Sequence, residues 1–262
     1  MMFKWLYRKY WIFAIAILIF ISIAINGCDS EDGLNCTQTA GDLVEVEIDV
    51  DFFNKITVYE RTGLIIKQGD QQKVVLRTGE NLVNDVEFKV ADNRLSIRNE
   101  NGCNVVRDYG ITIVEVTVPD LTELRSSTGE DIISDGILNF SNLTLLSNDG
   151  PEEDFYHSTG SFYLKLDVEN LFINTNKLSN FYLSGAVQNA NLNWDLGDGK
   201  LLAEDLVIQN AQIFHRGTND WNIDVKQNIS GTISGYGDVI LKSAPNSINV
   251  EENWRGRLIV PD

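Results

Sequence analysis

Two histidines are the side chains in this sequence best suited to acid–base chemistry near neutral pH. His157 lies beside Ser158 and close to Ser161, whereas His215 stands alone. A serine nucleophile of the hydrolase type needs a Gly-x-Ser-x-Gly turn between a strand and a helix, and the segment Gly231 to Gly235 lies in a β repeat instead. Isolated histidines carry no catalytic geometry by themselves. We therefore predict no catalytic residue, and we expect alanine at either histidine to change neither folding nor ligand retention.

Three groups of acidic side chains could attract a divalent cation. They are Asp195 with Asp198, the run Glu152-Glu153-Asp154, and the pair Glu251-Glu252. The segment around Asp195 resembles part of a calcium loop, but the later ligands and the final glutamate of an EF-hand are missing. Asp-Gly pairs are common in turns, so we expect solvent-exposed loops rather than a metal site. The sequence has no phosphate-binding glycine loop before a helix, and it predicts no cofactor.

An internal repeat must position these groups. Phe162-Tyr163-Leu164 recurs as Phe181-Tyr182-Leu183, and asparagines follow at positions 170, 189, 210 and 228, with spacings of 19, 21 and 18 residues. A repeat near twenty residues with short alternating apolar runs suits one coil of a parallel β-solenoid. Coils stack about 4.8 Å apart, so each asparagine can bond to the one above it. For an internal or turn ladder, we expect Asn189→Ala to cost about 1–3 kcal/mol.

The rest of the chain has the patterning of strands. Val44, Val46 and Ile48 alternate with acids, and further short apolar runs up to Val118 are separated by turn residues. Such runs without a helical period predict an all-β protein. One domain over residues 41–262 is the expected organisation.

The first residues have the composition of an export signal. Basic residues at positions 4, 8 and 9 precede an uncharged run from Tyr10 to Gly27. Ile25-Asn26-Gly27-Cys28 resembles the bacterial lipobox, in which the cysteine is lipidated and becomes the mature N-terminus. We predict a signal peptide over 1–27 and lipidation at Cys28. An uncleaved anchor is the alternative, because about 20 apolar residues span a bilayer.

A short acidic tract follows the cysteine. Asp29 to Gly33 resembles the export signal that sends Gram-negative lipoproteins to the outer face of the outer membrane, although a solvated linker has the same composition. We predict a tether over residues 28–40 and a lipid-anchored, surface-exposed position in the outer membrane. A periplasm-facing position is the alternative.

Two cysteines remain once Cys28 carries lipid. Cys36 and Cys103 are even in number and belong to an oxidising compartment, so we expect a disulfide between them. Closing that loop would stabilise the fold by about 4 kcal/mol. Two free buried thiols are the alternative.

The net charge limits the partners. The chain carries −17 at pH 7, and removing residues 1–27 takes away three basic residues to leave −20. Nucleic acid and anionic lipid headgroups would be repelled at long range. We therefore expect no nucleic-acid partner.

Several segments resemble a known family, the lipoprotein members of the head GIN domain (putative auto-transporter adhesin) family. The segments are Phe52 to Ile56, Gln68-Gly69-Asp70, Gly79 to Leu82, Asp92 to Ile97, Asn101 to Arg107, Val116 to Leu121, Ile229 to Leu241 with Pro245, and Gly256-Arg257-Leu258. The resemblance covers residues 36 to 260. It implies a right-handed, single-stranded parallel β-helix whose function is largely uncharacterised.

The resemblance and the composition together favour a non-enzymatic envelope lipoprotein that binds an extracellular glycan or protein. A solenoid face lined with Asn, Thr and aromatic residues suits polar ligands, and Tyr163, Tyr182, Trp194 and Trp221 are candidates for contact. Two alternatives remain. One is a carbohydrate-active β-helix enzyme, which shares the fold by analogy only, and the other is a purely structural envelope protein.

Overall fold

The computed structural model describes residue 15 and residues 38–101, 110–149 and 159–261. In this part of the chain, sixteen strands form one open sheet, and a single short 3₁₀ helix, η1 (Glu80–Asp85), lies between β4 and β5. The predicted all-β class is confirmed. Several predicted site residues lie outside the described residues: Cys28, Cys36, Cys103, Glu152, Glu153, Asp154, His157 and Ser158. Among the described residues, no helix is long and apolar enough to cross a membrane.

The first half of the sheet consists of short strands. They are β1 (Leu43–Ile48), β2 (Lys55–Tyr59), β3 (Gly63–Gln68), β4 (Lys73–Gly79), β5 (Val86–Ala91), β6 (Arg94–Asn99), β7 (Ile113–Val118) and β8 (Glu123–Ser127). Antiparallel pairs join β1 to β4, β4 to β7 and β5 to β6. Parallel pairs join β2 to β6 and β8, and β3 to β7.

The mixed sheet corrects the expectation of a purely parallel coil over the whole of residues 41–262. Local turn chemistry accounts for one of the three antiparallel pairs, β5 with β6. The two-residue turn between β5 and β6 holds Asp92 at φ 51° and Asn93 at φ 58°. This is the left-handed conformation of a type I′ turn, which favours Asp and Asn and returns the chain antiparallel to itself.

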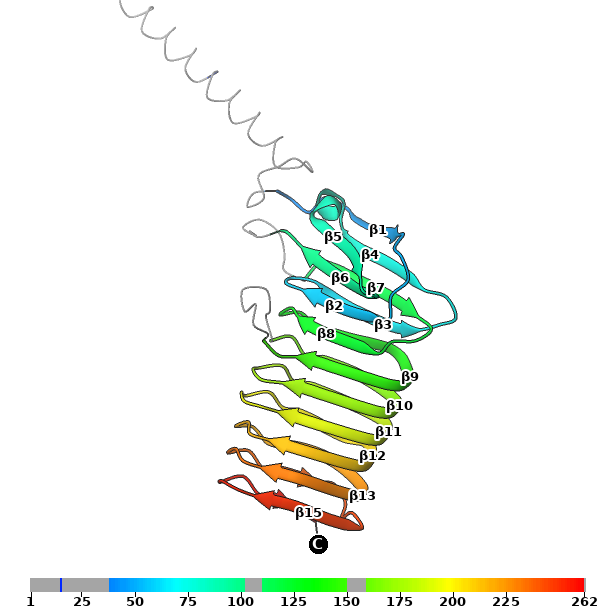
Figure 1. Ribbon diagram of the computed structural model, residues 1–262. Coiled ribbons are helices and arrows are strands. Elements are labelled where there is room, and N and C mark those ends of the chain that lie inside the picture. The colour runs from blue at the N-terminus through cyan, green and yellow to red at the C-terminus, as the bar shows by residue number, and fades with distance from the viewer. Residues whose placement is uncertain (1–14, 16–37, 102–109, 150–158, 262) are drawn as a thin grey trace, which may run out of the picture.

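The second half is dominated by long strands. They are β9 (Ile132–Ser147), β10 (Phe162–Thr175), β11 (Phe181–Trp194), β12 (Leu201–His215) and β13 (Trp221–Ile233), followed by the shorter β14 (Val239–Leu241), β15 (Ser247–Glu252) and β16 (Leu258–Ile259). These strands pair in parallel and stack in chain order, as the green-to-red column in Figure 1 shows. The predicted repeat is confirmed, because Phe162 pairs with Phe181 and Asn170 with Asn189.

Each long strand has two arms. The first residues of β13 pair with β14 and its last residues pair with β15, and β9 likewise pairs with β3 through its first arm and with β8 through its second. Burial alternates along each arm and resets where two consecutive residues are exposed, such as Glu169-Asn170 in β10. Side chains from both arms therefore point into one interior, while the outward residues of each arm form a separate surface.

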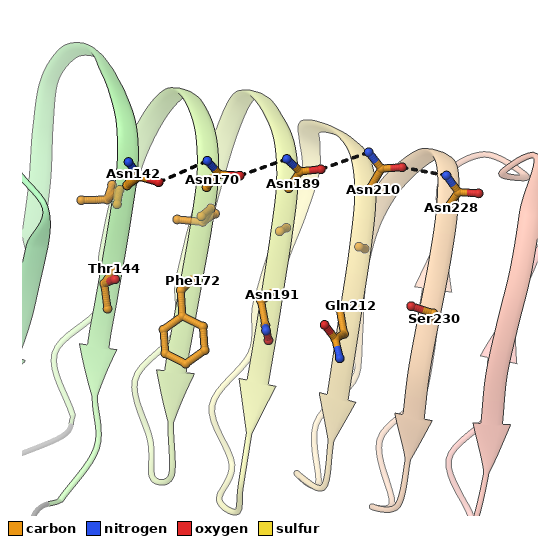
Figure 2. Close-up of a pocket in the computed structure, with 14 residues that line it drawn as sticks. Asn142, Thr144, Asn170, Phe172, Asn189, Asn191, Asn210, Gln212, Asn228 and Ser230 are labelled. Atoms are coloured by element: carbon orange, nitrogen blue, oxygen red, sulfur yellow. Dashed lines mark hydrogen bonds between the residues drawn. The ribbon is translucent and has the colours of Figure 1, made fainter.

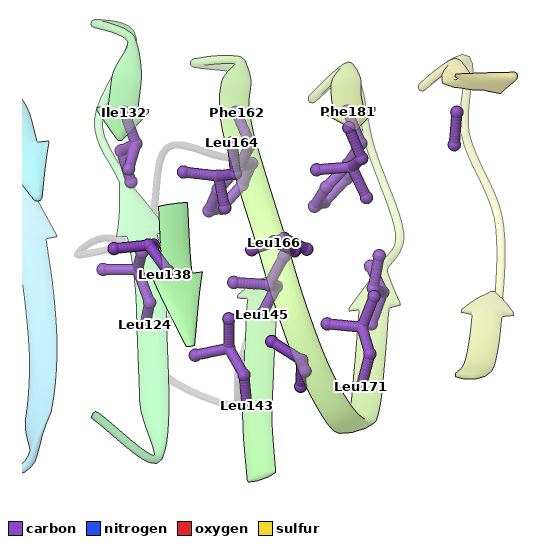
Figure 3. Packing of buried hydrophobic residues seen from close by; sticks show 14 of the residues in the cluster. Leu124, Ile132, Leu138, Leu143, Leu145, Phe162, Leu164, Leu166, Leu171 and Phe181 are labelled. Atoms are coloured by element: carbon purple, nitrogen blue, oxygen red, sulfur yellow. The ribbon is translucent and has the colours of Figure 1, made fainter. Parts of the chain in front are cut away.

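The interior is filled by rows of apolar side chains that stack from strand to strand (Figure 3). The rings of Phe162 and Phe181 lie parallel with centroids 4.6 Å apart, and Trp194 packs edge-on against Phe181. Burying one large apolar side chain contributes about 1.5–3 kcal/mol. Since each inward position recurs on every long strand, these rows stabilise the stack along its length.

Glycines at two positions of the long strands allow a sharp test of this close stacking. Gly185 and Gly136 both have positive φ, but a Cβ at Gly185 would lie 2.0 Å from the Leu166 carbonyl oxygen, whereas a Cβ at Gly136 would meet nothing within 4 Å. We predict that Gly136→Ala costs about 1–2 kcal/mol from backbone strain alone. Gly185→Ala should cost about 1–3 kcal/mol more, from the clash with β10. Urea unfolding of the two variants measures the difference, and equal losses would contradict this stacking.

Candidate ligand-binding face

A row of asparagines begins the second arm of each long strand. Asn142, Asn170, Asn189, Asn210 and Asn228 occupy one register position on β9 to β13. Each side-chain amide donates to the carbonyl oxygen of the preceding asparagine, with N···O distances of 3.1, 3.0, 3.1 and 2.7 Å along the row. Figure 2 shows the continuous chain of four hydrogen bonds. The predicted asparagine ladder is therefore confirmed.

The ladder differs from its prediction in one respect. It has a fifth member, Asn142, which lies 28 residues before Asn170 because a longer segment separates β9 from β10. The local pattern of an inward apolar residue followed by a polar residue and Asn, as in Phe140-Ser141-Asn142, could have revealed it. Of the two predicted positions, internal or turn, the ladder occupies the turn, at the exposed bend. Water can therefore satisfy amides that lose a neighbour, and the expected cost of losing one falls.

Two further outward positions on each second arm continue this surface. We define the amide face as three outward positions on each of the five long strands. Its residues are Asn142, Thr144 and Leu146 on β9, Asn170, Phe172 and Asn174 on β10, Asn189, Asn191 and Asn193 on β11, Asn210, Gln212 and Phe214 on β12, and Asn228, Ser230 and Thr232 on β13. Most of them are amides, and the others are hydroxyl-bearing or apolar.

The amide face carries no charged side chain, although 23% of the chain is charged. Charge returns only at its borders, with Glu123 and Arg125 on β8 and Glu251 on β15. The first arms are different. On β10, the outward residues of the first arm include Lys165 and Asp167. The outward surface of the first arms therefore carries charged side chains, whereas the amide face on the same strands carries none.

A shallow groove of about 500 Å³ runs along the amide face. The asparagine ladder forms one wall, and the parallel row of Thr144, Phe172, Asn191, Gln212 and Ser230 forms the other (Figure 2). The residues between the two rows, such as Ala190, point inward and are buried. The strand backbone therefore forms the floor of the groove, and the side chains of the two rows line it on either side.

The aromatic candidates from the sequence separate into two pairs. Tyr163 and Tyr182 are stacked with centroids 4.5 Å apart and lie on the first-arm surface, with 39% of Tyr163 exposed. Trp194 and Trp221 are fully buried, so the prediction that they contact a ligand is wrong. Alternation in the sequence separates the two sides of a strand, but it does not show which side faces the interior after the strand bends. The half-exposed Phe172 and Phe214 lie on the amide face instead.

His215 is also buried. It packs against Trp221 with ring centroids 4.3 Å apart, and its Nδ1 accepts a hydrogen bond from the Gly217 amide at 3.4 Å. Burial lowers the pKa of His215 to about 4. A neutral ring with this packing is part of the core, so the expectation that its replacement leaves folding unchanged is wrong.

The described acidic groups are surface features. Asp195 and Asp198 lie in an exposed turn after β11, where Asp198 accepts a hydrogen bond from the Thr218 hydroxyl. Glu252 lies on the edge strand β15 and binds Arg257 at 3.5 Å. Ser161 donates its backbone amide to Asp131. Within the described ranges, no group of three or more His, Cys, Asp or Glu side chains is placed to hold a metal ion.

Comparison with protein families gives one match. The model of a family described as "Putative auto-transporter adhesin, head GIN domain" matches residues 52–245. No curated protein sequence matches the chain significantly.

Solved structures with a similar fold include proteins from Bacteroides and Parabacteroides species. A putative adhesin from Bacteroides fragilis superimposes with a TM-score of 0.74 at 18% identity, covering 85% of this chain and 99% of that one. A putative lipid binding protein from Parabacteroides distasonis gives 0.58 at 15% identity, with coverages of 84% and 97%. A putative adhesin from Parabacteroides merdae gives 0.53 at 19% identity, with the same coverages. At these identities the likeness shows a shared fold only.

The exposed ladder predicts a small and position-dependent effect on stability. Asn189→Ala removes the bonds to both Asn170 and Asn210, whereas Asn228→Ala removes only the bond to Asn210. We expect a loss of about 1 kcal/mol for Asn189→Ala and about half of that for Asn228→Ala. Thermal unfolding of both variants measures the ratio. A neutral Asn189→Ala would mean that the ladder does not contribute to stability.

The buried histidine predicts a pH dependence. Its pKa is about 4 in the folded protein and about 6.5 when unfolded, so the unfolded state binds more protons between these values. The contribution of His215 to stability should therefore be complete above pH 6.5 and fall by about 3 kcal/mol as the pH drops to 4. The carboxylates of the chain titrate in the same range, so the comparison between variants isolates the histidine. His215→Phe should lose this component of the pH dependence, and His157→Phe should keep it. Identical pH profiles for His215→Phe and the wild type would refute the assignment.

Proposed function

We propose that this chain, which belongs to the head GIN domain family, is a non-enzymatic, adhesin-like binding module of the cell envelope whose contact surface is the amide face. The single observation that carries the proposal is the uncharged, regularly spaced array of amides on five adjacent strands. Repeated donors and acceptors suit a partner that is itself extended and polar. The amide face also has no carboxylate pair of the kind that hydrolyses glycosides, which supports binding without turnover.

We also propose that β9 to β16 form coils of a right-handed, single-stranded parallel β-helix. Two observations support this architecture. The long strands are parallel, with a continuous register along their second arms, and β14 and β15 pair with successive parts of the same strand β13. Stacked coils of this kind give a rigid, elongated scaffold, which suits presentation of a binding surface away from a membrane.

The domain organisation and location remain those expected from the sequence. Residues 1–27 would be a signal peptide, Cys28 a lipid-bearing residue with palmitate among its acyl chains, residues 28–40 an acidic tether, and residues 41–262 the folded domain. Several acyl chains anchor a protein stably, whereas one gives only marginal binding. This anchoring would hold the domain at the outer membrane with its surface exposed.

A disulfide between Cys36 and Cys103 would join two segments that approach the same short helix. Gln38 donates to the Asn81 carbonyl at 2.7 Å, and the Glu100 amide donates to the Asp85 carbonyl at 2.8 Å. Asn81 and Asp85 are both residues of η1. Each cysteine lies within three residues of one of these contacts, so the geometry of the described neighbours supports the pairing.

The cysteine assignments predict two chemical results. Metabolic labelling with a radioactive fatty acid should mark the wild type and leave Cys28→Ala unlabelled. Mass spectrometry of unreduced peptides should then find Cys36 linked to Cys103 in both proteins. Equal labelling of the two proteins would contradict the anchor, and two freely alkylated thiols would contradict the disulfide.

The binding function predicts that charge on the amide face abolishes adhesion. The side chains of Asn191 and Gln212 have no hydrogen-bond partner among the described residues, so Asn191→Glu with Gln212→Glu should leave the fold intact. Beads coated with the wild-type domain should be retained on surfaces covered with extracellular glycans or proteins, and beads coated with the double variant should be lost. Asn222→Glu, on the first-arm surface of β13, is the matched control and should behave as the wild type. Equal retention of all three proteins would reject the amide face as the contact surface.

A further inference from the structure

The uncharged groove also defines the chemistry of what it binds. We propose that the amide face binds a neutral, unbranched polysaccharide whose chain runs across the strands from β9 to β13. This inference rests on the proposed binding function and names the ligand class for the same surface.

Electrostatics exclude a charged polymer. An acidic polysaccharide would meet no cation on the amide face and would be repelled by a protein of net charge −17. A basic polymer would find its counter-charges on the first-arm surfaces, where Asp167 and Asp205 are exposed, rather than in the groove. A charge buried against uncharged amides also loses hydration without gaining an ion pair. The groove therefore favours a ligand that carries no charge.

The hydrogen-bonding groups match sugar hydroxyls. Each amide offers two N–H donors and a carbonyl acceptor, and each hydroxyl both donates and accepts. Asn191 and Gln212 are exposed and have no partner in the described part of the chain, so their full capacity faces the groove. The opposite wall is the asparagine ladder. There the Asn189 amide donates one hydrogen bond to Asn170 and accepts one from Asn210. Its remaining groups are thus fixed in position before a ligand arrives, which lowers the entropic cost of binding.

Two aromatic rings supply the apolar part of sugar recognition. Phe172 lines the groove on β10, and Phe214 lies on β12 two residues beyond Gln212. Both are half-exposed between polar neighbours. An aromatic face attracts polarised C–H groups, such as those on the apolar side of a pyranose ring. The combination of amides and half-exposed rings discriminates against a polar polymer without such C–H faces.

The repeat of the face selects a polymer with a short, regular unit. Neighbouring strands are about 4.8 Å apart, so the ladder from β9 to β13 spans about 19 Å. The same group recurs at every step, which suits a chain whose units advance by a similar length. A peptide strand would instead pair with the free backbone of an edge strand, such as β1, β15 or β16, and would not lie over the side chains of the five long strands.

Binding of purified neutral oligosaccharides to the whole mature protein tests the proposal. Linear β-glucan and mannan oligosaccharides of increasing length, titrated calorimetrically, should bind more tightly with each added sugar until the chain spans all five strands. Asn191→Ala and Gln212→Ala should each weaken binding by about fivefold, since each removes one neutral hydrogen bond. Asn222→Ala is the matched control and should bind as the wild type. Affinity should not change with salt or with a chelator, because neither the ligand nor the face is charged.

The outcomes separate this proposal from the function on which it rests. If bead adhesion depends on the amide face but no neutral oligosaccharide binds or competes, the ligand class is wrong and the binding function stands. If only an acidic polysaccharide binds, or if binding requires a divalent cation, the neutral class is likewise overturned. If a neutral oligosaccharide binds equally to Asn191→Ala, Gln212→Ala and Asn222→Ala, the site is elsewhere on the molecule.

Discussion

Parallel, in-register pairing of the long strands is the constraint on which the rest of this structure depends. Backbone hydrogen bonds fix neighbouring strands about 4.8 Å apart, and the register then places equivalent residues directly above one another from β9 to β13. A side chain at one position therefore always has the same two neighbours. Phenylalanine stacks on phenylalanine inside, and asparagine donates to asparagine at the bend.

The same register produces two surfaces that differ in charge. The first arms carry charged outward side chains among neutral ones, such as Lys165 and Asp167 on β10, whereas the second arms present the uncharged amide face. The bend at the asparagine ladder divides the two, and its hydrogen-bonded amides fix the orientation of that edge. A strongly acidic protein can in this way remain soluble through one surface and offer a neutral contact through the other.

Burial decides which sequence candidates can take part in binding. Trp194, Trp221 and His215 fill inward positions, where their rings pack against one another and stabilise the stack. Polar side chains that have no hydrogen-bond partner among the described residues, such as Asn191 and Gln212, lie on the outside. The uncharged amide face consists of fifteen residues from five strands, and it becomes a continuous surface only when those strands stack.

The sequence by itself determined the all-β class and the twenty-residue repeat, because short-period patterns and local turn residues are visible along one chain. It also identified four members of the ladder from their spacing. The family followed from segments that resemble its members. Only the tertiary structure showed the antiparallel pairs of the first half, the fifth ladder member Asn142 and the burial of Trp194 and His215. Alternation along a strand gives the two sides of that strand but not which side faces the interior after a bend. The bend and the register of neighbouring strands supply that information, since both depend on contacts between residues far apart in the sequence.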